Sequence, residues 1–180
     1  SMSNRIGQVW IETVIYTLIG IVLIGMVLAF AKPAIDEQKD KRFIESSIEA
    51  MKEFDNTISN VIDGGVSNQR EIDFFIKNGI FTIQADNNFN GHDAIIFNFK
   101  GSNFAPSEVR RATNFINIPV SDLKIKTQEA GNKYDVIIVR EFENNVNITY
   151  NGGDKIKEFN FAATPYRFIV KNNGRVGDVV

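Results

Sequence analysis

The 180 residues suffice for one compact domain with an appended segment. Lys+Arg number 20 and Asp+Glu 22, so the near-neutral chain offers no sign of a basic surface for phosphate groups, and nucleic acid binding is unsupported. Cysteine is absent, which excludes disulfides, thiolate metal sites and thiol nucleophiles. The fold must therefore depend on an apolar core and on backbone hydrogen bonds.

The N-terminus combines a short leader over residues 1–7, in which we interpret Met2 as the natural start, with a long apolar segment. Residues 13–31 carry no charge, and as a helix they span roughly 28 Å, close to the roughly 30 Å hydrocarbon core of a bilayer. No small-residue cleavage site follows this segment, and a mixed-charge stretch begins at Lys32. We therefore expect a retained transmembrane or filament-core helix over 8–33, not a discarded secretory signal.

The order of Gly7, Gln8, Glu12 and the apolar run resembles the class III signal peptide of archaeal type IV pilins. The resemblance covers residues 4 to about 62, although Trp10 stands where the family commonly has serine. It implies that a prepilin peptidase cuts after Gly7, so that Gln8 becomes the first residue and Glu12 the fifth. It also implies self-assembly with identical or related pilins, an assembly ATPase and platform, and a location in the membrane and then in an extracellular filament.

Glu12 has two interpretations, because a carboxylate near the start of a membrane helix is costly without a partner or a role. It could lie at the interface in the first turn, where the positive helix end favours an anion by about 0.3–1 kcal/mol. Alternatively, it pairs with the α-amino group of Gln8, whose unperturbed pKa is roughly 7.7, within one subunit or between neighbours. We favour the second interpretation, in which Glu12 is an assembly residue.

A second helical pattern continues over 34–65. Pro33 lacks an amide donor and predicts a kink or a brief interruption at its start. Apolar residues then recur at helical spacing and predict one buried stripe, which covers either a sheet of the same domain or neighbouring subunits: Ile44, Ile48, Met51, Phe54, Ile58 and Ile62. Asp63-Gly64-Gly65 predicts the end of the helix.

After residue 66 the pattern predicts an all-β extracytoplasmic head over 66–180. A hairpin is expected from 72–76 and 80–84, because Asn78-Gly79 lies between two alternating runs. Further strands are expected at 94–100, 123–127, 134–142, 146–150, 156–161 and 166–171, with a short helix at 107–114. The predicted fold class is α+β: a long N-terminal helix, membrane-spanning and then amphipathic, packed on an antiparallel β-sandwich-like head.

Two head motifs are candidates for chemistry. Asp86, Asn88 and Asn90 with Gly91 match the opening of a calcium loop, but the closing Glu is replaced by Phe97, so we expect an ordinary turn and no metal. Asn147 opens the single N-glycosylation sequon. With one histidine, His92, and no phosphate loop or dinucleotide fingerprint, we expect neither an enzyme nor a cofactor.

These observations predict a structural subunit of an archaeal type IV pilus-like filament, assembled through its N-terminal helix. Two alternatives stay open: a single-span membrane-anchored binding or adhesion protein, and a minor pilin that does not form the filament body. The biological role of the filament does not follow from the sequence.

Overall fold

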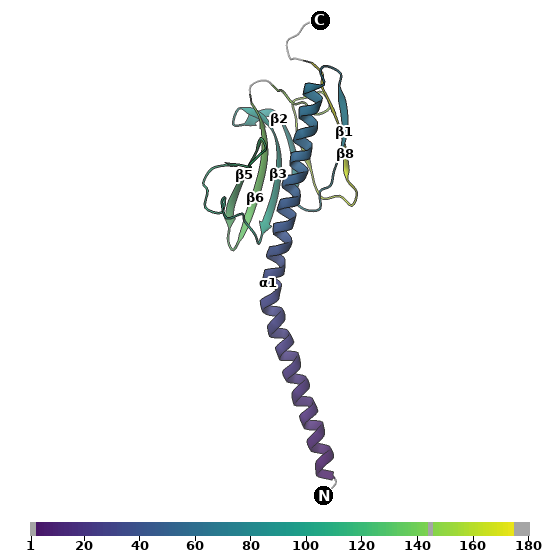
Figure 1. Cartoon of the computed structure of the whole chain (residues 1–180), viewed down its shortest axis with the longest axis vertical. Helices are drawn as coiled ribbons and strands as arrows, with labels where there is room; N and C mark the ends of the chain where they lie inside the picture. The colour runs from purple at the N-terminus through teal and green to yellow at the C-terminus, as the bar shows by residue number, and fades with distance from the viewer. Residues whose placement is uncertain (1–2, 144–145, 175–180) are drawn as a thin grey trace. The chain divides into compact units, whose positions relative to one another are not determined.

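The computed structural model describes residues 3–143 and 146–174, and of residues 3–6 only the backbone. The chain divides into two compact units, Ser1–Lys39 and Asp40–Val180; we call the second the head unit. A single long helix, α1 (Ser3–Asp63), comes first, and all strands of the described residues follow it in the head unit (Figure 1). The expected α+β class with a long apolar N-terminal helix is confirmed.

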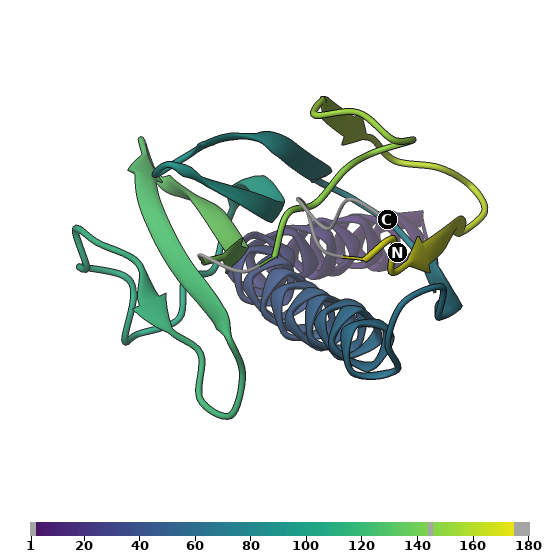
Figure 2. The ribbon, with the colours of Figure 1, turned by 90° about the horizontal axis from the view of Figure 1, so that it is seen from above.

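The strands form two sheets in which every pair is antiparallel. Their bounds are β1 (Gln69–Phe74), β2 (Ile80–Phe89), β3 (His92–Ser102), β4 (Ile116–Asn117), β5 (Leu123–Ala130), β6 (Lys133–Phe142), β7 (Ile156–Phe159) and β8 (Tyr166–Lys171). One sheet has six strands in the order β4-β5-β6-β3-β2-β7, and the other pairs β1 with β8. Seen from above, the end of α1 lies beside both sheets (Figure 2).

Both sheets bury the same helix face. Phe54 of α1 packs against Phe74 of β1, Phe81 of β2 and Phe168 of β8, with ring centroids 5.9, 5.3 and 5.4 Å away. One turn of helix thus joins the two sheets into one core. Such aromatic pairs favour edge-to-face or offset contacts, which give the core a defined geometry as well as buried area.

The predicted stripe is correct except at its end. Ile44, Met51, Phe54 and Ile58 are buried, but Ile62 is 40% exposed and Val61 is buried in its place. Each four-residue step along an α-helix overshoots a full turn by about 40°, so two steps from Phe54 carry Ile62 off the buried face. The seven-residue step to Val61 stays within about 20° of it.

The predicted hairpin at 72–76 and 80–84 is wrong, because its two strands belong to different sheets. β1 pairs with β8, and β2 pairs with β3 and β7. The Asn-Gly turn that does close a hairpin is Asn90-Gly91, between β2 and β3, where φ is +52° and +86°. Both residues have the left-handed backbone that a type I′ turn needs.

Pro33 does not interrupt α1, which continues through it from Ser3 to Asp63. A proline inside a helix removes one backbone hydrogen bond, and here the bonds of the flanking turns keep the helix continuous. The expected end is confirmed: the helix stops at Asp63, the Gly64 amide donates to the Asn60 carbonyl at 3.0 Å, and Gly65 has φ +83°.

The predicted helix at 107–114 is a turn. The Val109 and Arg110 amides both donate to the Pro106 carbonyl. The Val109 carbonyl then accepts from the Ala112 amide at 3.2 Å and from the Thr127 hydroxyl of β5 at 2.6 Å. A tertiary hydrogen bond thus joins the local one where the turn ends.

The predicted strand at 146–150 is also wrong. Its only ladder-like contact among the described residues is an isolated bridge between Tyr150 and Gly153. The Ile148 amide instead donates to the Asp93 carboxylate at 2.8 Å. A side chain therefore takes the donor that a strand partner would use.

We expect Phe54→Ala to lower the free energy of unfolding of the head unit by about 3–5 kcal/mol, since it leaves a cavity where both sheets meet the helix. Denaturant unfolding of a fragment that begins at Asp40 measures this change. Glu53→Ala, one position away on the exposed face, is the matched control and should stay within about 0.5 kcal/mol. Equal losses in both variants would contradict a core centred on Phe54.

Candidate functional site

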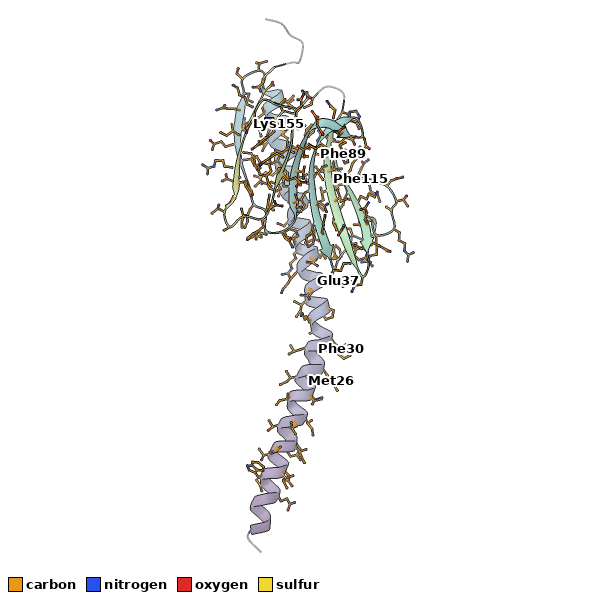
Figure 3. All side chains as sticks on the ribbon, turned by 180° about the vertical axis from the view of Figure 1, so that it is seen from behind. Met26, Phe30, Glu37, Phe89, Phe115 and Lys155 are labelled. Atoms are coloured by element: carbon orange, nitrogen blue, oxygen red, sulfur yellow. The ribbon has the colours of Figure 1, made fainter. Side chains whose placement is uncertain are left out.

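The apolar part of α1 has no cover within the described residues. Its large side chains are exposed, from 40% at Val14 to 83% at Phe30, and none of its most apolar stretch is buried. Figure 3 shows Met26 and Phe30 projecting outward from the helix. A helix that is apolar all round requires lipid or other helices around it. α1 thus contains a segment long and apolar enough to cross a membrane.

The hydroxyl groups of this segment are satisfied by its own backbone. Thr13 donates to the Val9 carbonyl at 2.9 Å, and Thr17 donates to the Thr13 carbonyl at 2.8 Å. In hydrocarbon, a hydrogen-bonding group without a partner has a free-energy cost of roughly several kcal/mol. These internal bonds therefore make the two threonines compatible with lipid. They also leave Thr13 and Thr17 without a hydroxyl proton to offer a neighbour.

Glu12 is exposed and lies more than two turns from the start of α1. The helix begins at Ser3, and its first turn contains no acidic residue. Because the positive end of a helix acts only within its first turn, this end stabilises the Glu12 carboxylate only after residues up to Gly7 are removed. The Gln8 amide donates to Glu12 at 3.5 Å, which is the long limit for a hydrogen bond and a weak contact.

The candidate calcium residues form the tip of the β2–β3 hairpin. Both carboxylate oxygens of Asp86 accept hydrogen bonds from Asn88, from its backbone amide at 3.2 Å and from its side chain at 2.5 Å. Desolvation opposes ionisation here, but these hydrogen bonds outweigh it and lower the pKa of Asp86. Asn90 belongs to the two-residue turn itself. No cluster of three or more acidic or histidine side chains that could hold a metal occurs among the described residues.

Asp93 is buried and already occupied. It is 2% exposed, accepts from the Asn87 amide at 3.0 Å and from the Ile148 amide at 2.8 Å, and so connects the hairpin to the 146–150 segment. The neighbouring Asn147 is exposed, as a glycosylation acceptor must be, and the two residues before Val146 lie outside the described residues. Phe97, at the position of the missing calcium ligand, is buried in β3.

The hairpin tip also carries an aromatic contact that the sequence analysis missed. Phe89 of β2 and Phe115, which precedes β4, lie with ring centroids 5.9 Å apart, and Lys126 Nζ lies 5.8 Å from the centre of the Phe115 ring (Figure 3). Twenty-five residues separate the two rings, so no local spacing signals this pair.

Arg140 is a second residue that the sequence analysis missed. Its Nε donates to Asp55 of α1 at 2.6 Å, a second nitrogen lies 3.3 Å from Asp122, and a third donates to the Glu141 carbonyl at 2.7 Å. Nearby, a polar groove of about 330 Å³ is lined by Asn117, Ser121, Asp122, Lys124, Arg140, Glu141, Phe142, Glu143 and Val146. The lining has three acidic and two basic side chains, and both Lys124 and Arg140 are paired with carboxylates, so neither cation is free to bind an anion.

Comparison with known proteins identifies no relative. No protein-family model, no curated protein and no solved structure matches this chain.

We expect thermal melts of the head unit in millimolar calcium and in chelator to coincide. An ion that prefers six to eight oxygens would find at this hairpin a carboxylate already hydrogen-bonded to Asn88, and a bound ion would raise the melting temperature by mass action. A calcium-dependent rise that Asp86→Ala abolishes would contradict this expectation and assign the hairpin a metal.

Proposed function

We propose that this protein is a structural subunit of an archaeal type IV pilus-like surface filament and has no enzymatic activity. The observation that carries the proposal is the uncovered apolar helix directly after Gly7, Gln8 and Glu12. Before assembly, lipid surrounds this helix; in the filament, the helices of other copies replace the lipid. While the apolar helix is in the membrane, the head unit lies on the extracytoplasmic side. In the filament, the head units form the outer surface.

Helix–helix contact in lipid gains nothing from the hydrophobic effect, because lipid tails are as apolar as leucine. Packing and polar contacts must therefore favour assembly. Glu12 supplies such a contact: a carboxylate in an apolar setting is stabilised when the charged α-amine of a neighbour's Gln8 lies beside it. The proposal includes two kinds of partner besides other pilins, a prepilin peptidase and an assembly ATPase with its membrane platform.

A permanently anchored extracytoplasmic binding or adhesion protein is the second candidate, together with a minor pilin outside the filament body. The exposed helix fits both, because an anchor also needs an apolar span. Glu12 favours the filament subunit over the permanent anchor: in an anchor the carboxylate has only its interfacial role, whereas in a subunit that loses residues up to Gly7 it also pairs with an amine during assembly.

The first test is processing. We expect mass spectrometry of the native protein to find Gln8 as the first residue, and we expect Gly7→Asp to block cutting, since a large charged side chain replaces the small residue at the cleavage position. Gly25→Ala, farther along the helix, is the control and should be processed normally. An intact leader on the membrane-bound native protein would contradict cleavage after Gly7.

The second test concerns Glu12. Glu12→Ala should insert into the membrane at least as well as the wild type, because it removes a charge from the apolar segment. It should enter filaments much less, because the neighbour's amine is left unpaired. Imaging and immunoblotting of filaments from cells with matched membrane levels measure this. Equal incorporation would leave Glu12 only its interfacial role and favour the anchor.

A further inference from the structure

The polar residues at the start of the apolar helix lie on one face. Gln8, Glu12, Tyr16 and Gly20 follow one another at four-residue spacing, and residues four apart on an α-helix are neighbours on its surface. Thr13 and Thr17 lie along one side of this line. The opposite face is formed by Trp10, Ile11, Val14 and Leu18. The segment is therefore apolar overall, but where it enters the membrane it has one face with polar residues and one face that is entirely apolar.

Tyr16 is the one polar side chain of this line whose role the proposed function leaves unexplained. Its side chain is 71% exposed, so its hydroxyl is directed to whatever surrounds the helix. Unlike Thr13 and Thr17, tyrosine cannot bend its hydroxyl back to the backbone of the preceding turn. It lies one turn beyond Glu12 into the apolar run, where water is scarce and a hydrogen-bond donor needs a partner.

We propose that the Tyr16 hydroxyl donates a hydrogen bond to the Glu12 carboxylate of a second copy of this chain, in a parallel helix pair displaced by four residues. This inference rests on the proposed function and deepens it, because it names the helix face and the axial register of assembly. We call this helix face the register face; it consists of Gln8, Glu12, Tyr16 and Gly20.

One displacement satisfies the whole register face. A four-residue shift, about 6 Å along the axis, brings Glu12 of one copy level with the Gln8 amine of its neighbour. The same shift brings Tyr16 of the first copy level with Glu12 of that neighbour. Each carboxylate along a row of copies then receives one ammonium and one phenol, and hydrogen bonds to an ionised acceptor are stronger than neutral ones.

Gly20 completes the match. In the four-residue register, Gly20 of one copy lies level with Tyr16 of its neighbour. A Cβ placed on Gly20 meets, beyond its chain neighbours and the adjacent backbone of its own helix, no atom of the chain within 4 Å, so the space above this glycine is open. Small residues let membrane helices approach closely, and here the open space suits the ring of the neighbouring tyrosine.

The first experiment removes only the Tyr16 hydroxyl oxygen. It uses the full-length chain, expressed in its native cell. Tyr16→Phe keeps the ring and should lower the association of subunits about 3- to 20-fold at equal membrane levels, as expected for one interhelical hydrogen bond. Thr17→Val is the matched control, because the Thr17 hydroxyl is bonded to its own helix. Unchanged assembly of Tyr16→Phe, or an equal loss in Thr17→Val, would overturn the inference.

The second experiment measures the register with cysteines, which the natural chain lacks. Val9→Cys in one copy and Thr13→Cys in another lie beside the register face, keep Glu12 and Tyr16 intact, and should cross-link on oxidation when co-expressed. Trp10→Cys with Val14→Cys has the same spacing on the opposite face and should not cross-link.

The outcomes separate the inference from the proposed function. Two results in assembled filaments would overturn the four-residue register: cross-links only between Trp10→Cys and Val14→Cys, or cross-links only between two copies of Val9→Cys. Either result would leave the proposed filament function intact. A wild-type protein that never forms filaments would overturn the proposed function, and the inference with it.

Discussion

The head unit depends on one constraint: a single face of α1 is buried by two sheets at once. Phe54 contacts β1, β2 and β8, and the stacked rings of Phe74 and Phe81, 4.5 Å apart, bring the sheets together beside it. The β1–β8 ribbon has only two strands, and such a ribbon is marginal in water without a surface to pack on. The helix supplies that surface.

Polar contacts set where the helix lies on the large sheet. Asn103 donates to the Asp40 carboxylate through its backbone amide and its side chain, at 2.7 and 2.8 Å, at the first residue of the head unit. Four turns later, Arg140 of β6 binds Asp55 at 2.6 Å. Apolar packing alone tolerates sliding, whereas two directed bonds at separate heights define one register.

The other half of α1 has the opposite property, since its apolar side chains are exposed within the described residues. The two threonines satisfy their own hydroxyls, while Glu12 and Tyr16 keep polar groups directed outward. In the proposed filament, a helix built this way is tolerated by lipid before assembly and is then completed by a second copy. The proposed filament uses this difference: the head unit is complete on its own, and the apolar helix is not.

The sequence by itself determined the elements whose signal is local: the apolar run, the buried stripe through Ile58, the end of α1 near Gly64 and the bounds of β8 at Tyr166–Lys171. Tertiary structure decided the pairing. Asn78-Gly79 predicts a hairpin by local rules, but core packing sends the flanking strands to different sheets. Likewise, the roles of Asp93 and Arg140 depend on partners 55 and 85 residues away, and no spacing along the chain encodes such contacts.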